Sequence, residues 1–275
     1  MAKPPKFKQK SYSENNTLSP IGTNGAPWPP SATSKERKLP VVCDFRTLDV
    51  ALGGQGAPLV PIGDKLLFAE YDFCLNLGGF ANVSYDISSS DGERLRCAFD
   101  ICPVNIVMNP ICETLGKPYD DKGEIARSGM LSNYLLNEFN QIGFYKSVLD
   151  SPKSLGKEWV IKNINPILDR YELAENDLLR TFCEHIAFQI GKSLKNKPDG
   201  KLLITGGGAY NSFLVECIKS HTAHEIVIPD KCTIEFKEAL IFAFLGVLRM
   251  RGEVNCLKSV TGAMQDNCGG AIYLA

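Results

Sequence analysis

Two glycine-rich segments hold the residues whose types and spacing could bind a phosphate group. The first is L-N-L-G-G-F-A-N-V at 75–83, which contains Asn76, Gly78, Gly79 and Asn82. The apolar residues on both sides predict two strands around a Gly-Gly turn. A turn without side chains lets backbone N–H groups approach phosphate oxygens closely. An ordinary hairpin turn would explain the same pattern, so this segment alone leaves both interpretations open.

The second segment is L-L-I-T-G-G-G-A-Y-N at 202–211, with Gly206, Gly207, Gly208 and Asn211. Its apolar start predicts a buried strand that runs into three glycines and then into a helix. The N-terminus of a helix carries unpaired N–H groups and a partial positive charge, which attract anions. The spacing matches neither a dinucleotide-binding fingerprint nor a Walker P-loop. Nucleotide binding and a helix-packing turn both remain open for this segment.

Hydrophobic patterning predicts the elements that must position these turns. The expected strands lie at 40–45, 73–77, 82–87, 95–101, 201–205 and 225–228, and the expected helices at 105–115, 131–142, 177–194 and 235–250. Asn176 or Asp177 is a suitable N-cap for the third of these helices. A meander of three strands followed by alternating helices and strands indicates the α/β class. That order favours a ribonuclease-H-like fold over a doubly wound Rossmann sheet.

The composition changes near residue 40. Residues 1–40 are rich in proline, carry seven Lys or Arg against two Glu, and show no helical or strand periodicity. Such a segment is expected to be disordered. It is either a basic tail for an acidic partner or a lead sequence foreign to the folded part. The chain is therefore divided into this lead, residues 41–70, and a larger unit at 71–275.

Bulk composition argues against several classes of protein. A formal net charge of −1, with 44% hydrophobic and 22% charged residues, gives no reason to expect nucleic acid or an anionic membrane as a partner. No apolar run approaches the roughly 20 residues of a transmembrane helix, and no secretory signal is recognisable. Ten cysteines without a C-x-x-C spacing are expected to be free thiols, and three scattered histidines argue against a His-rich metal site. We expect a cytoplasmic protein.

Five segments together carry a resemblance to a known family. They are D-F-R-T-L-D-V-A-L-G-G-Q-G-A-P-L-V-P at 44–61, L-N-L-G-G-F-A-N-V at 75–83, G-G-G-A-Y-N at 206–211, E-A-L-I-F-A-F-L at 238–245 and S-V-T-G-A at 259–263. On these motifs the chain resembles the anhydro-N-acetylmuramic acid kinases, which are actin/hexokinase-like ATPases. The resemblance implies a ribonuclease-H-like fold. Its N-terminal lobe would be incomplete, with 41–70 as the remnant, and its C-terminal lobe at 71–275 largely complete.

The resemblance also implies a reaction and the residues that perform it. The reaction is ATP-dependent phosphorylation of 1,6-anhydro-N-acetylmuramic acid, with hydrolytic opening of the anhydro ring. Asp49 matches the position of the catalytic base, although it could instead cap a helix or loop before the glycine run. Asp100 could hold the Mg²⁺ of the nucleotide. Arg46 and Glu238 match contacts to the amino sugar. Alternatively, Arg46 pairs with Asp44, and Glu238 stabilises the first turn of its helix. The residues assigned to ATP are Asn76, Gly78, Gly79, Asn82, Gly206, Gly207, Gly208 and Asn211. A homodimer is a further expectation.

The sequence departs from the family pattern in two places. In F-D-I-C-P-V-N at 99–105, Cys102 and Val104 stand where the family has glycines, and Asn109 follows where the family has a carboxylate. Between residues 1 and 40 there is no strand–turn–strand unit for the β- and γ-phosphates. Three interpretations follow. The chain is a kinase whose missing lobe comes from another chain, a module that binds nucleotide or sugar without turnover, or a poorly folding remnant.

Overall fold

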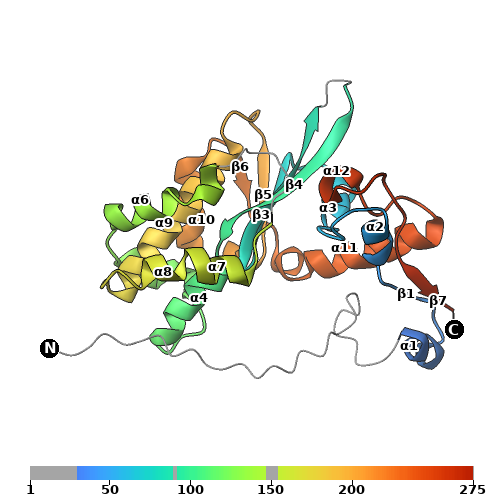
Figure 1. Cartoon of the computed structure of the whole chain (residues 1–275), viewed down its shortest axis with the longest axis horizontal. Helices are drawn as coiled ribbons and strands as arrows, with labels where there is room; N and C mark the ends of the chain where they lie inside the picture. Colours follow the sequence, from blue (N-terminus) through green and yellow to red (C-terminus); the bar gives the residue numbers. More distant parts are fainter. Residues whose placement is uncertain (1–29, 89–91, 147–153, 275) are drawn as a thin grey trace.

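The larger part of the molecule is built on a mixed five-stranded sheet (Figure 1). In spatial order its strands are β4 (Arg94–Pro103), β3 (Phe80–Ser88), β2 (Phe73–Leu77), β5 (Lys201–Thr205) and β6 (Glu225–Val227). The first three form the predicted antiparallel meander, whereas β5 and β6 run parallel to β2. The prediction of an α/β protein is therefore confirmed, with a mixed sheet.

The structure is a computed structural model that describes residues 30–88, 92–146 and 154–274. The predicted disorder of residues 1–29 lies outside this part of the chain. Residues 30–40, which were also expected to be disordered, contain the helix α1 (Pro30–Arg37). Ser34 on this helix donates a hydrogen bond to the carbonyl of Leu274, so the helix is attached to the end of the described chain.

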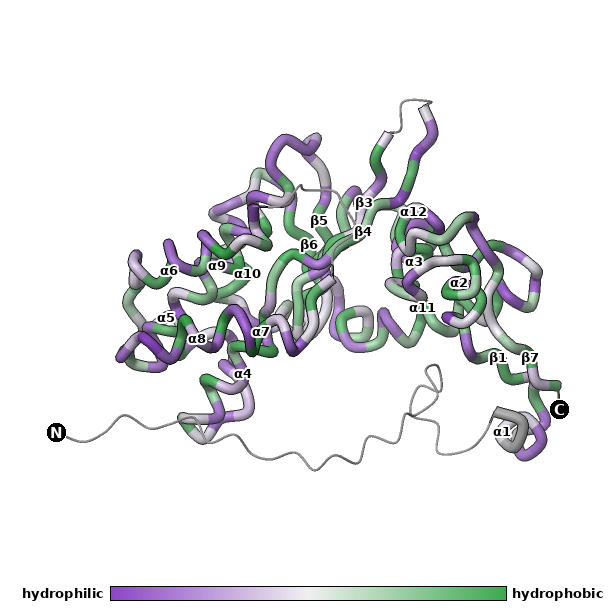
Figure 2. Tube along the Cα trace, viewed as in Figure 1, coloured by the Kyte–Doolittle hydropathy of each residue, from purple (hydrophilic) through white to green (hydrophobic). Residues whose placement is uncertain are grey.

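Helices pack on the sheet and form the main hydrophobic core with it. They are α4 (Asn105–Thr114), α5 (Glu124–Ser128), α6 (Asn133–Asn140), α7 (Lys157–Asn163), α8 (Asn165–Leu168), α9 (Glu175–Leu194) and α10 (Ser212–His221), with short 3₁₀ turns η1 (Asp121–Gly123), η2 (Gly143–Lys146) and η3 (Gly207–Tyr210). One side of α9, the helix predicted at 177–194, is buried in this core, including Leu179, Phe182 and Ile186. Figure 2 shows hydrophobic residues along β5 and its neighbouring strands.

A second, smaller core lies beside the sheet. It contains the antiparallel pair β1 (Val41–Cys43) and β7 (Ala271–Tyr273), together with α2 (Thr47–Ala51), α3 (Pro61–Leu67), α11 (Lys231–Arg251) and α12 (Lys258–Thr261). Its buried residues are Phe45, Leu59, Ile62, Ile241, Leu245, Leu248 and Cys256. Residues 41–70 therefore do not pack as a separate unit, because they share this core with residues 241–257.

Helix α11 connects the two cores. Ile234, near its N-terminus, belongs to the main core, while Ile241 and Leu245 belong to the smaller one. Figure 1 shows α11 reaching from the sheet to the smaller part. The contact with α3 is close, because a Cβ added at Gly63 would lie 2.5 Å from Ile241. A single helix thus contributes residues to both cores and connects them.

Two further sequence expectations can be compared with the structure. All ten cysteines are free, as predicted from their spacing. In the part of the chain that the structure describes, no helix has the length and apolarity that a membrane crossing requires.

Candidate functional site

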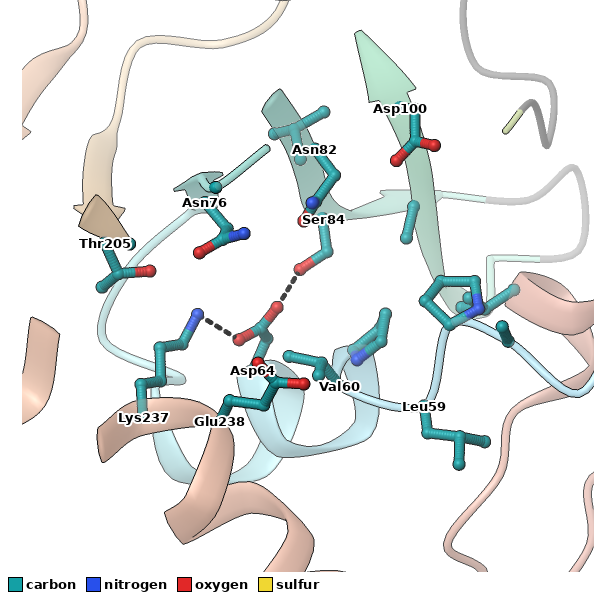
Figure 3. A pocket seen from close by; sticks show the side chains of 18 of the residues that line it. Leu59, Val60, Asp64, Asn76, Asn82, Ser84, Asp100, Thr205, Lys237 and Glu238 are labelled. Carbon is teal, nitrogen blue, oxygen red and sulfur yellow. Dashed lines mark hydrogen bonds and ion pairs between the residues drawn. The ribbon is translucent and has the colours of Figure 1, made fainter. Parts of the chain in front are cut away.

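A cavity of about 780 Å³ lies between the sheet and the smaller core. Strand ends of the sheet form one wall, and α3, α11 and the segment before α3 form the other (Figure 3). The sequence-predicted site residues that line it are Arg46, Asn76, Gly78, Asn82, Asp100, Gly206, Gly207 and Glu238. Residues predicted from separate motifs therefore meet around one space.

The two glycine turns meet because their strands are neighbours. β2 and β5 are parallel, and Asn76 pairs with Thr205 in their register. The turns that follow these strands consequently lie at the same edge of the sheet. The Asn76 amide fits between them: a Cβ at Gly206 would lie 2.6 Å from its Oδ1, and a Cβ at Gly78 would lie 3.2 Å from its Nδ2. This is the arrangement in which a ligand binds at the carboxyl ends of parallel strands.

The three glycines after β5 have different roles. Gly206 has a φ of +80°, and a Cβ at this position would lie 2.9 Å from the Leu77 carbonyl carbon. A Cβ at Gly208 would lie 2.6 Å from that of Leu77, and Gly208 does not line the cavity. At Gly207 the nearest atom would be Asn105 Nδ2 at 3.8 Å, so this glycine faces open space. Packing thus explains the glycines at 206 and 208, whereas Gly207 leaves free space beside the cavity.

This difference gives a testable prediction. Gly207→Val places a side chain in the cavity without a close contact, so the free energy of unfolding should change by less than about 1 kcal/mol. Its affinity for adenine nucleotides should fall at least about tenfold, because the site loses room. Gly208→Val is the matched control and should lower the free energy of unfolding by about 2–3 kcal/mol, because it overpacks Leu77. Urea denaturation and calorimetric titration measure the two effects. Equal destabilisation by both variants would contradict the assignment.

Gly79 and Asn211 do not line the cavity. The carbonyl of Gly79 accepts a hydrogen bond from the Val104 N–H at 2.8 Å, so the Gly-Gly turn supports the start of α4. Asn211 is the N-cap of α10, and its Oδ1 accepts from the Leu214 N–H at 2.9 Å. Neither residue therefore lies at the cavity where the other predicted nucleotide contacts meet.

Asp100 lies at the cavity wall opposite Asn82 in the register of β3 and β4. It is half-buried, and its carboxylate accepts a hydrogen bond from the Leu155 N–H at 2.7 Å. Burial raises the pKa of this carboxyl group, although hydrogen bonds from Leu155 and Ser154 partly oppose the shift. Within the described ranges, no group of three or more His, Cys, Asp or Glu could hold a metal ion.

The two predicted sugar contacts lie on the opposite wall. Glu238, on α11, is exposed and lines the cavity. Arg46 donates a hydrogen bond to the Gly56 carbonyl at 2.5 Å. The alternative pairing of Arg46 with Asp44 is absent from the described part of the chain, where Asp44 accepts from the Thr47 hydroxyl instead. Arg46 and Glu238 therefore remain available to a ligand.

Asp49 is placed differently from the prediction. It is fully buried, does not line the cavity, and accepts four hydrogen bonds. Its Oδ1 accepts from Cys256 at 3.1 Å, Thr261 at 2.7 Å and Asn267 at 3.1 Å, and its Oδ2 accepts from the Gly56 N–H at 2.8 Å. Burial raises its pKa, but these four hydrogen bonds outweigh it and hold the pKa below the ordinary value. In this structure Asp49 is therefore enclosed by protein donors and does not open on the cavity, while its role as a base stays a prediction.

The position of Asp49 organises the loop that carries part of the cavity wall. A Cβ at Gly54 would lie 2.2 Å from Asp49 Oδ2, so the carboxylate fits only against a glycine. The Gly56 N–H binds Asp49, and the Gly56 carbonyl binds Arg46. Asp49 thus fixes the loop that orients Arg46, and it links this loop to the C-terminal segment.

The cavity lining also includes polar residues that the sequence analysis did not assign to a site, among them Asp64, Thr205 and Lys237. Lys237 and Asp64 form a buried ion pair with 2.7 Å between Nζ and Oδ1. The signal for Lys237 was present in the sequence. Lys237 falls on the helical stripe of Ile234 and Ile241, where a charged residue is rarely buried unless it is paired.

Comparison with known proteins shows which family this chain resembles. A sequence profile of the family described as anhydro-N-acetylmuramic acid kinase matches residues 30–275. The anhydro-N-acetylmuramic acid kinase of Bacillus cereus (strain ATCC 10987 / NRS 248) is 33% identical over 258 residues, which are 86% of this chain and 65% of that protein. The one of Sulfurovum sp. (strain NBC37-1) is 35% identical over 254 residues, which are 89% of this chain and 68% of that protein. The chain thus spans about two thirds of the length of these relatives.

Among solved structures, the activator of the 2-hydroxyisocaproyl-CoA dehydratase from Clostridium difficile, with bound ADPNP, aligns over 70% of this chain and 66% of that chain. The TM-score of this alignment is 0.40, at 16% sequence identity.

Proposed function

The chain belongs to the anhydro-N-acetylmuramic acid kinase family, and from this premise we propose that its cavity binds ATP and 1,6-anhydro-N-acetylmuramic acid. The proposed reaction phosphorylates the sugar and opens its anhydro ring by hydrolysis, yielding N-acetylmuramic acid 6-phosphate. The observation that carries this proposal is the meeting of both glycine turns with Arg46, Asp100 and Glu238 around one cavity. The strand ends suit the phosphates, and the opposite wall suits a polar sugar.

We further propose that the fold is the ribonuclease-H-like fold of actin-like ATPases. The strand order β4-β3-β2-β5-β6, with β2 antiparallel to β3 and parallel to β5, supports it. The smaller core would then be part of an N-terminal lobe and the sheet the core of the C-terminal lobe. Since residues 241–257 pack with residues 42–68, the proposed lobe boundary runs along α11 and not at residue 70.

Asp100 is the residue proposed to serve Mg²⁺. Magnesium in kinases is held by one or two carboxylates together with water and substrate phosphates, so a single carboxylate at the cavity wall fits this requirement. The bound metal would neutralise charge on the nucleotide. The Leu155 N–H keeps the Asp100 carboxylate oriented, and the free cysteines are consistent with a reducing, cytoplasmic setting.

With Asp49 buried, we assign the contact with the sugar hydroxyls to Glu238, together with Arg46. Glu238→Gln removes an ionised acceptor, so the KM for the sugar should rise about tenfold while the KM for ATP changes less than about twofold. Glu225→Gln on β6 is the control, because Glu225 is exposed and does not line the cavity. The assay mixes ATP, Mg²⁺ and the anhydro sugar and measures the 6-phosphate by mass spectrometry.

The same assay separates turnover from binding alone. The specific reason to test binding alone is that the chain spans 65% of the length of the Bacillus cereus relative. Calorimetric binding of ATP without product would support a binding module. A wild-type chain that binds neither ATP nor the sugar would overturn the proposed function.

A further inference from the structure

Lys237 is a buried cation on the cavity wall that none of the roles above uses. Its side chain is 7% exposed, and that of its partner Asp64 is 6% exposed. Asp64 Oδ2 also accepts a hydrogen bond from the Ser84 hydroxyl at 2.6 Å. The Phe68 ring lies under the ammonium, 5.3 Å from its centroid. Contacts from α3 and the residue after it, supported by β3, therefore fix the position of the ammonium, which is carried by α11.

The ammonium has hydrogen-bonding capacity to spare. An ammonium carries three N–H donors. Among the residues that the structure describes, Asp64 is the one polar partner of Lys237. The Arg46 guanidinium also lines this cavity, and the proposed function assigns it to the sugar. Lys237 is thus a second cation with donors left for a ligand.

Thr205 provides an independent sign of a ligand at the same place. It is 1% exposed and lines the cavity, and its hydroxyl has no hydrogen-bond partner within the described ranges. Figure 3 shows the side chains of Thr205, Asn76 and Lys237 pointing toward one another. A buried hydroxyl without a partner is unfavourable in a folded protein, so a ligand atom would satisfy it.

We infer that Lys237 and Thr205 bind a phosphate group of the nucleotide, and that Asp64 is a positioning residue for the Lys237 ammonium. This inference rests on the proposed nucleotide binding. A phosphate is favoured over a sugar hydroxyl for two reasons. The donors include a full positive charge, and they lie at the ends of β2 and β5, beside glycine turns that let backbone approach an anion.

The test is calorimetric titration of MgATP, MgADP and adenosine into the full chain. Lys237→Met should weaken MgADP and MgATP binding at least about tenfold and adenosine binding less than about twofold. Asp64→Asn keeps the ammonium but weakens the contact that positions it, so MgADP affinity should fall by about two- to fivefold, less than in Lys237→Met. Lys219→Met, exposed on α10 and outside the cavity, should match the wild type.

Each outcome has a defined meaning. If Lys237→Met binds MgADP as the wild type does, or loses adenosine and MgADP equally, Lys237 does not bind phosphate. A loss of MgADP binding in Asp64→Asn equal to that in Lys237→Met would make the pair purely structural. Should Lys237→Met fail to fold, the double variant Asp64→Asn/Lys237→Met, which leaves no buried charge, carries the measurement. A wild-type chain that binds no nucleotide would overturn the proposed function together with this inference.

Discussion

Asp49→Asn is expected to lower the free energy of unfolding by about 3 kcal/mol. The wild-type carboxylate accepts from Gly56, Cys256, Thr261 and Asn267 in a fully buried site. The asparagine amide group has one acceptor oxygen and one donor nitrogen. Its NH₂ group would therefore point at a protein group that is itself a donor. At least one buried group would then lose its partner. Urea denaturation at neutral pH measures the change.

Asp266→Asn is the matched control. Asp266 is exposed and accepts one backbone hydrogen bond, from the Lys258 N–H at 2.8 Å, so its loss should cost less than about 1 kcal/mol. The acid side of the stability curve gives a second check. Because the folded pKa of Asp49 is lowered, its ionisation stabilises the fold above the unfolded value of 3.8, and this part is lost as pH falls through the folded pKa. Asp49→Asn should lack that loss. Equal stability of wild type and variant would contradict the structural role.

The second large effect is a fall in the free energy of unfolding at low pH, and we expect His185 to cause it. The imidazole is fully buried against Phe139, Tyr145 and Phe182, and burial lowers its pKa to about 3. Its Nδ1 lies 2.8 Å from the acceptor Asn140 Oδ1, so the neutral ring carries its proton there. Within the described residues, Nε2 has no hydrogen-bond partner. A second proton would therefore be buried without compensation.

The direction of the pH effect follows from the two states. The unfolded chain binds this proton near the ordinary value of 6.5, whereas the folded chain binds it only near 3. Stability should thus fall by about 2–3 kcal/mol between pH 7.5 and 4.5, a window above the range in which Asp49 titrates. Urea denaturation at several pH values measures this loss.

His185→Gln should be less stable at neutral pH and should lack this loss. His221→Gln, at a half-buried histidine 2.6 Å from Glu184, leaves the buried ring in place and should retain it. Parallel curves for wild type and His185→Gln would show that the buried ring does not cause the pH dependence.

The local features of the fold could be predicted from the sequence. The hairpin at Gly78 and Gly79 depends on two apolar strands and a short turn, all within one segment. Helix starts were less predictable. The N-cap of α9 is Ala174, without a side-chain hydrogen bond, so the prediction of Asn176 or Asp177 was wrong. The Asp177 carboxylate instead accepts from the Met130 N–H at 2.7 Å, a tertiary contact that takes it away from capping.

For helix α11, a cap that exists was overlooked in the sequence analysis. It begins at Lys231 and not at residue 235, because Asp230 caps it and accepts from both the N–H and the hydroxyl of Thr233. The cap was visible in the sequence as an Asp three residues before a Thr. Apolar periodicity, which begins later, hid it.

The site was predictable where its residues follow strands and unpredictable where distant segments meet. The positions of Gly78 and Gly207 at the cavity could be predicted because each follows a strand motif, and the two strands are neighbours. The burial of Asp49 could not be predicted, since three of its four donors come from residues 256–267 and no local pattern indicates them. For Lys237, the helical period indicated burial, but its partner Asp64 lies on another helix.

The smaller core also has a consequence for how the chain folds as it is synthesised. Residues 42–68 are synthesised well before their partners from residue 241 onward. At about 5–20 residues per second, synthesis of the intervening segment takes roughly 10–35 s. During that time Phe45 and Ile62 have no partners from α11, and Asp49 lacks three of its donors. We therefore expect the sheet to fold first, and the growing chain to need protection from aggregation until residues 241–257 complete the smaller core.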